Sequence, residues 1–130
     1  KDDNEQIVIQ SVNPDQLYKK SDWQFRGSLG VIQLQKNNLA YLYLGSGRFI
    51  SYQQYSMEST KPDGAAHLVI NRNKLQLTCN QETVININTS GARSATLTMN
   101  GKSETLPVTK TASGIKFTVR TIENGEIEIK

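Results

Sequence analysis

Few side chains in this sequence could carry out acid–base or nucleophilic chemistry. The one histidine, His67, lies in AAHLVI, and a lone His in an apolar strand is more often a hydrogen-bonded structural residue than a base. The one cysteine, Cys79, shares the alternation of LQLTCN with Leu75 and Leu77, which predicts a small buried side chain. A single cysteine allows neither an internal disulfide nor a cysteine zinc site. We therefore predict no catalytic residue, no metal and no other cofactor.

Two further patterns resemble catalytic motifs without their context. Glu126 and Glu128 in EIEIK would share one face of a strand, and we interpret them as a solvated face that protects the last strand from edge pairing, not as a glycosidase pair. GSGR, residues 45–48, lacks the lysine of a phosphate-binding loop and has no helix after it. It is interpreted as a turn.

Aromatic residues give a stronger pattern. Tyr41 and Tyr43 share one face of NLAYLYLG, and RFISYQQY adds further rings and an arginine. Rings stack on the apolar face of a sugar, and an arginine can bind a uronate carboxylate with two hydrogen bonds. The candidate carbohydrate-binding residues are Tyr41, Tyr43, Arg48, Tyr52 and Tyr55. The alternative is that both faces of a central strand are buried and the tyrosines only reach solvent with their hydroxyls.

The elements that must position these residues are short strands. Period-2 runs rich in Val, Ile, Thr and Tyr occupy residues 5–12, 28–35, 38–45, 66–70, 74–79, 83–88, 95–99, 114–119 and 126–130. Turn-forming separators recur about every ten residues, the spacing of antiparallel sandwiches and barrels. The prediction is an all-β fold, an antiparallel β-sandwich of about ten short strands. At most one short helix is expected, near residues 14–20, where Asn13 could cap and Pro14 could begin it.

Asn100-Gly101 is the clearest hairpin signal, because a type I′ turn needs positive φ at both central residues. A strict two-residue loop would place Leu97 opposite Glu104, and a longer loop or a bulge would shift that register by one. Pro107 predicts an edge position or a strand end. The predicted core contains Leu75, Leu77, Leu97, Phe117, Val119 and Ile127.

Length and charge limit the class of protein. The 130 residues fit one domain, 1–130, that can bury its own core. The 15 basic and 12 acidic residues give a net charge of +3 and are scattered, unlike the basic face of a nucleic-acid-binding protein. No stretch has the ~20 apolar residues of a membrane helix, and KDDNEQ lacks the apolar core of a signal peptide. We expect any export signal to have been removed or to lie on a longer parent.

The sequence also shows a family resemblance. The stretch from ATLTMNGK to EIEIK resembles the closing strands of β-sandwich domains that end many carbohydrate-active enzymes. NNLAYLYLGSGRFISYQQYSMES is similar to the late β-sheet segment of heparinase II/III-like polysaccharide lyases. Together these stretches span roughly residues 38–130.

The resemblance implies a role in a larger protein. It implies that the chain is the non-catalytic C-terminal accessory domain of a secreted or periplasmic lyase, which cleaves uronate-containing polysaccharide by β-elimination. The implied partners are the catalytic domain of the same parent chain and an acidic polysaccharide. A free-standing carbohydrate-binding module and a non-enzymatic surface or adhesion domain remain the alternatives.

Overall fold

The computed structural model describes residues 4–36 and 38–130, and the described residues form strands and turns without a helix. The thirteen strands are β1 (Asn4–Gln10), β2 (Tyr18–Lys19), β3 (Trp23–Gln35), β4 (Asn38–Tyr52), β5 (Tyr55–Ser59), β6 (Gly64–Asn71), β7 (Lys74–Cys79), β8 (Thr83–Ile87), β9 (Ala95–Met99), β10 (Lys102–Leu106), β11 (Thr109–Lys110), β12 (Ile115–Val119) and β13 (Ile122–Ile129). The predicted all-β class is confirmed.

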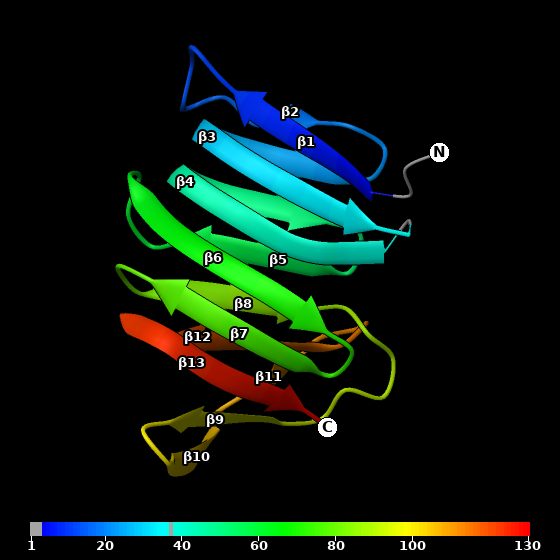
Figure 1. Cartoon of the computed structure of the whole chain (residues 1–130), viewed down its shortest axis with the longest axis vertical. Helices are drawn as coiled ribbons and strands as arrows, with labels where there is room; N and C mark the ends of the chain where they lie inside the picture. The colour runs from blue at the N-terminus through cyan, green and yellow to red at the C-terminus, as the bar shows by residue number, and fades with distance from the viewer. Residues whose placement is uncertain (1–3, 37) are drawn as a thin grey trace.

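One continuous antiparallel sheet curls into two layers (Figure 1). The front layer runs β1-β3-β4-β6-β7-β13 and continues through β9 to β10. The second layer, β5-β8-β12-β11, joins the front one through the last residues of β4, while β2 pairs with the start of β3. The arrangement is the predicted β-sandwich, with the short strands β2, β5 and β11 beyond those expected.

The long strands β3 and β4 belong to both layers. β4 pairs with β6 between Tyr41 and Gly47, and with β5 from Phe49 to Tyr52. The ladder between β3 and β4 shifts register around Gly27 and Gly47. The prediction that residues 45–48 form a turn is therefore wrong. Their glycines let the strand bulge and bend while it stays paired.

The core lies between the layers and consists of aliphatic and aromatic side chains from both. The front layer contributes Ile32, Leu42, Leu68 and others, and the second layer contributes Met57, Ile85 and Ile115. All six predicted core residues are buried: Leu75, Leu77, Leu97, Phe117, Val119 and Ile127. Cys79 is buried as predicted, and its Sγ donates a hydrogen bond to the Arg120 carbonyl oxygen at 3.3 Å.

The turns differ in how clearly the sequence predicts them. Asn100 and Gly101 have φ values of 53° and 77°, and Leu97 lies opposite Glu104, so the strict two-residue register is the one formed. Pro107 directly follows β10, at the predicted strand end. Near residue 14 a β-turn replaces the expected helical turn: the Gln16 N–H donates to the Asn13 carbonyl at 3.2 Å, and β2 follows.

Glu126 and Glu128 do not protect a sheet edge, because β13 lies between β7 and β9 and pairs with both. That part of the interpretation is wrong. The alternation holds nevertheless: Ile127 is fully buried while Glu126 is exposed. The two glutamates therefore line the outer face of an interior strand, where Glu126 pairs with Gln76 on one side and Thr98 on the other.

Candidate functional site

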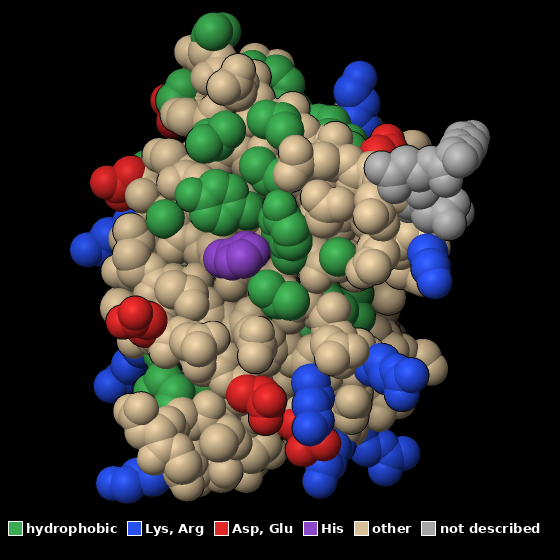
Figure 2. Space-filling model, viewed as in Figure 1, with side chains coloured by type: hydrophobic (Ala, Val, Ile, Leu, Met, Phe, Trp, Pro, Cys, Tyr) green, Lys and Arg blue, Asp and Glu red, His purple; other side chains and the backbone are tan. Residues whose placement is uncertain are grey.

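The outer face of the front layer carries two parallel rows of side chains that cross the strands. One row runs through Val8, Val31, Tyr43, His67 and Thr78, each paired with the next across neighbouring strands. The other runs through Gln6, Gln33, Tyr41, Val69 and Gln76. We call the central part of these rows, Val8, Val31, Tyr41, Tyr43, His67 and Val69, the aromatic platform. Figure 2 shows His67, the one purple side chain, surrounded by hydrophobic groups on this face.

The His67 ring contacts both tyrosine rings of the platform. Its ring lies edge-on to Tyr41 with the centroids 4.9 Å apart, and edge-on to Tyr43 at 5.8 Å. The Gln6 side-chain amide reaches the Tyr41 hydroxyl at 3.4 Å. Burial lowers the pKa of His67 below its usual value, because the charged imidazolium loses hydration among these rings. The neutral form of the imidazole is therefore favoured more than in an exposed histidine.

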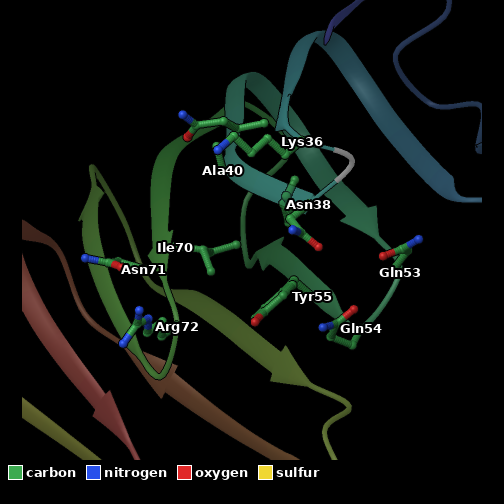
Figure 3. A pocket seen from close by; sticks show the side chains of 11 residues that line it. Lys36, Asn38, Ala40, Gln53, Gln54, Tyr55, Ile70, Asn71 and Arg72 are labelled. Atoms are coloured by element: carbon green, nitrogen blue, oxygen red, sulfur yellow. The ribbon is translucent and has the colours of Figure 1, made fainter. Parts of the chain in front are cut away.

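A second feature, here named the end cleft, is lined by the end of β6, the start of β4 and the β4–β5 turn. These segments lie on the right in Figure 1. The cleft has a volume of about 650 Å³. Figure 3 shows side chains that line it: Tyr55 comes from β5, Ile70 from β6, and Asn38 from the start of β4. Lys36, Gln53 and Arg72 belong to the turns β3–β4, β4–β5 and β6–β7 around it.

A smaller hollow of about 150 Å³ adjoins the end cleft and shares Tyr55 and Arg72 with it. Its other walls include the apolar side chains of Ile87 and Ile129. Burial raises the pKa of Tyr55, opposed by a side-chain hydrogen bond to Gln54, so the phenol stays protonated and can donate or accept a hydrogen bond.

The five residues predicted to bind carbohydrate do not form one surface. Tyr41 and Tyr43 lie together on the platform, and Tyr55 lies in the end cleft. Tyr52 is only 6% exposed and packs in the core, where burial and the nearby carboxylates of Asp22 and Glu5 raise its pKa.

Arg48 lies in neither place. It lines a separate hollow of about 230 Å³ with Arg26, Phe49 and Glu58. The cause is the bend in β4: the register shifts between Leu44 and Phe49 turn the second half of the strand away from the face that carries Tyr41 and Tyr43. Carbohydrate binding by the predicted residues therefore stays a prediction, to be judged for each surface separately.

Sequence reasoning did not single out Lys36, Asn38 or Arg72 in the end cleft. Lys36 and Asn38 flank the β3–β4 connection and Arg72 lies in the β6–β7 turn, and the two connections meet only through the folding of the sheet. A detectable signal was the repeated combination of amide and basic residues in these connections, as in QLQKNN and NRN.

Metal chemistry finds no support among residues 4–36 and 38–130: no group of three or more His, Cys, Asp or Glu side chains is placed to hold an ion there. In the same part of the chain, no helix has the length and apolar character needed to cross a membrane.

Comparison with protein families gives one informative match. The model of the family described as the endo-acting ulvan lyase C-terminal domain matches residues 1–70, which is more than half of the 130-residue chain. No curated protein matches the chain. The matched residues include β1 to β4 and the whole of the platform. The match supports a polysaccharide lyase C-terminal domain, and it does not single out the heparinase II/III-like lyases that the sequence resembled.

Proposed function

The chain belongs to the endo-acting ulvan lyase C-terminal domain family, and we propose on that basis that it is a non-catalytic accessory domain whose aromatic platform packs against the catalytic part of the same parent lyase. A C-terminal domain of a lyase implies a catalytic domain in the same chain. The platform is the surface best suited to meet it.

The observation that carries this proposal is the apolar character of the platform, in which Val8 is exposed and the other five side chains are half-buried. It lies on the outer face of a sheet whose inner face already covers the core, so the fold of this chain does not require it to be apolar. Val8 is 55% exposed at its edge. Contiguous exposed apolar surface on a folded domain commonly marks a protein contact, and aromatic residues are enriched in such contacts.

The platform is better suited to a protein surface than to chemistry. Tyr41, Tyr43 and His67 do not line any of the hollows described above. A β-elimination site needs a cleft that holds the sugar and excludes water around the acid and base. A flat, half-buried group of rings packed edge-on offers contact area instead.

Hydroxyl-radical footprinting tests the proposal, since tyrosine and histidine side chains are readily oxidised when solvent reaches them. We expect oxidation of Tyr41, Tyr43 and His67 to fall several-fold in the full-length parent compared with the isolated chain. Tyr18, which is partly buried on β2, serves as the internal reference and should react equally in both. Equal reactivity of the platform in both proteins would contradict docking, and would favour a free-standing carbohydrate-binding module or an adhesion domain.

The remaining features of the proposal rest on the resemblance of residues 38–130 to carbohydrate-active enzymes. We propose that the parent is secreted or periplasmic and acts on a uronate-containing glycan, and that its catalytic part is of the heparinase II/III-like kind. The full-length gene sequence tests each point: it should encode an export signal and a helical toroid upstream. A catalytic part of another fold would overturn the heparinase II/III-like assignment alone.

A further inference from the structure

The end cleft combines the three kinds of group that saccharide recognition uses. Its floor is formed by Leu39, Tyr55 and Ile70, which are partly buried and pack on the core. Its walls carry side-chain amides, among them Asn38, Gln53 and Asn71, all of which are exposed. An apolar floor suits the C–H face of a pyranose, and planar amides can donate to and accept from its hydroxyls. The volume of about 650 Å³ is within the usual range of ligand pockets.

The charge of the cleft is of one sign. Lys36 and Arg72 line it, and none of its described lining residues is acidic. Neither cation forms an ion pair with another described residue. An arginine guanidinium matches the two oxygens of a carboxylate or sulfate, and lysine adds a mobile point charge.

The turns that carry these groups have defined backbone shapes. Lys36, Gln53 and Arg72 have φ values of 51°, 49° and 58°, so each occupies the left-handed region at the tip of its hairpin. The turn at Gln53 is further fixed by two backbone hydrogen bonds. The Gln53 N–H donates to the Asp22 carbonyl at 2.9 Å, and the Asn88 N–H donates to the Gln54 carbonyl at 2.8 Å. Anchored turns reduce the ordering cost of binding.

The cleft also continues into a second hollow. Tyr55 and Arg72 stand at the junction between the end cleft and the smaller apolar hollow. A chain of several sugars could cross this junction, with one ring stacked on Tyr55 and an acidic substituent beside Arg72. Two adjoining hollows fit a segment of polysaccharide better than a small metabolite.

We infer that the end cleft binds an acidic oligosaccharide, with Arg72 and Lys36 pairing to its carboxylate or sulfate groups and Tyr55 stacking on a sugar ring. The class of ligand rests on the proposed function, whereas the cationic, amide-lined groove is a property of this chain alone. The site lies at the end of the sandwich, apart from the outer sheet face that forms the platform, so docking and glycan binding use different surfaces.

Titration of the 130-residue chain with defined oligosaccharides, followed by amide shifts in NMR spectra, tests the inference. The probes are an oligogalacturonate, a sulfated oligosaccharide without carboxylates, and a neutral oligosaccharide of equal length. We expect saturable shifts at residues 35–40, 53–55 and 70–73 with acidic probes only. The relative affinities of the first two probes identify whether carboxylate or sulfate is preferred.

The double variant Lys36→Asn, Arg72→Asn removes both charges, and Asn tolerates the left-handed backbone at these positions. Affinity for the acidic probes should fall about tenfold or more. The matched control is Lys116→Gln, Arg120→Gln, which removes the same charge from exposed positions in and beside β12 and should change affinity less than about twofold. Tyr55→Leu keeps an apolar floor and removes the stacking ring.

Three outcomes would overturn the inference: no saturable shift at millimolar ligand, shifts centred on Tyr41 and Tyr43, or an equal loss of affinity in the control variant. None of them bears on the footprinting result, which reports the contact between the platform and the catalytic part. Failure of this site and failure of the proposed function are therefore separate results.

Discussion

Gly27 on β3 and Gly47 on β4 face each other so closely that a Cβ atom built on either would lie 2.6 Å from the Cα of the other. This contact lies where both strands pass from one layer to the other. Side chains cannot be accommodated there because the neighbouring atoms are backbone, which cannot rotate away. The pair of glycines thus allows the bend that joins the two layers.

Gly47→Ala should destabilise the protein by about 1 to 3 kcal/mol through overpacking against backbone. Gly45→Ala is the matched control, because its new Cβ would meet the Leu29 Cδ2 atom at 2.9 Å, the end of a flexible side chain. We expect that control to cost less than about 1 kcal/mol. Urea unfolding curves of both variants measure the difference, and equal midpoints would show that the bend tolerates a methyl group.

Phe117→Ala should lower the free energy of unfolding by about 3 to 5 kcal/mol, because it leaves a large cavity between the layers. Phe117 is 2% exposed and lies on β12 opposite Ile85. Thr118→Ala, at the exposed neighbouring position, should change stability by no more than about 0.5 kcal/mol. Thermal unfolding followed by circular dichroism checks both, and a Phe117→Ala melting curve that overlays the wild type would place this ring outside the core.

The single histidine should titrate below its usual pKa of about 6.5, since burial disfavours the imidazolium form of His67. Below that pH the unfolded chain binds the proton more readily than the folded one, so stability falls as pH falls from the unfolded pKa through the folded one. The Cε1 proton signal of His67 measures the pKa directly. Replacing His67 with Gln should flatten the dependence of the urea midpoint on pH in this window, and an unchanged slope would assign the effect to other groups.

The isolated chain should release no unsaturated uronate from acidic polysaccharides, because His67, its one histidine, and the neighbouring Tyr41 and Tyr43 lie on a flat face and not in a substrate cleft. Ultraviolet absorbance of the product double bond measures this during incubation with heparin, chondroitin sulfate, alginate or ulvan. The full-length parent is the positive control. A signal from the isolated chain that disappears in Tyr43→Phe would instead make the platform a catalytic surface.

Strict alternation made several elements predictable from the sequence. KLQLTC and ATLTM correspond residue for residue to β7 and β9, since buried side chains alternate with more accessible ones along β7 and along β9 as far as Thr98. The Asn100-Gly101 hairpin was predictable for a local reason as well, because few residue pairs adopt two positive φ values.

The bend and the end cleft were not predictable in this way. Glycines at residues 45 and 47 are typical both of a turn and of a bulged strand. Only the strand pairing of β4 in the structure shows that they belong to a bulged strand. The turn at Gln53 contains no Gly, Asn or Pro, so no local sequence pattern predicts it. Because the sequence does not predict this turn, it assigns Tyr52 and Tyr55 to one surface. In the structure Tyr52 lies in the core and Tyr55 in the end cleft.

The position of β13 has a consequence for synthesis of the protein. Residues 122–129 form β13, which pairs with β7 on one side and β9 on the other. The front layer therefore has no pairing between β7 and β9 until β13 is in place. A nascent chain that lacks β13 exposes two unpaired strand edges and the apolar side chains of Leu75 and Leu97, a combination prone to aggregation. Closure of the sandwich therefore waits until residues 122–129 have left the ribosome, and a product truncated before them is open to proteolysis and chaperone capture.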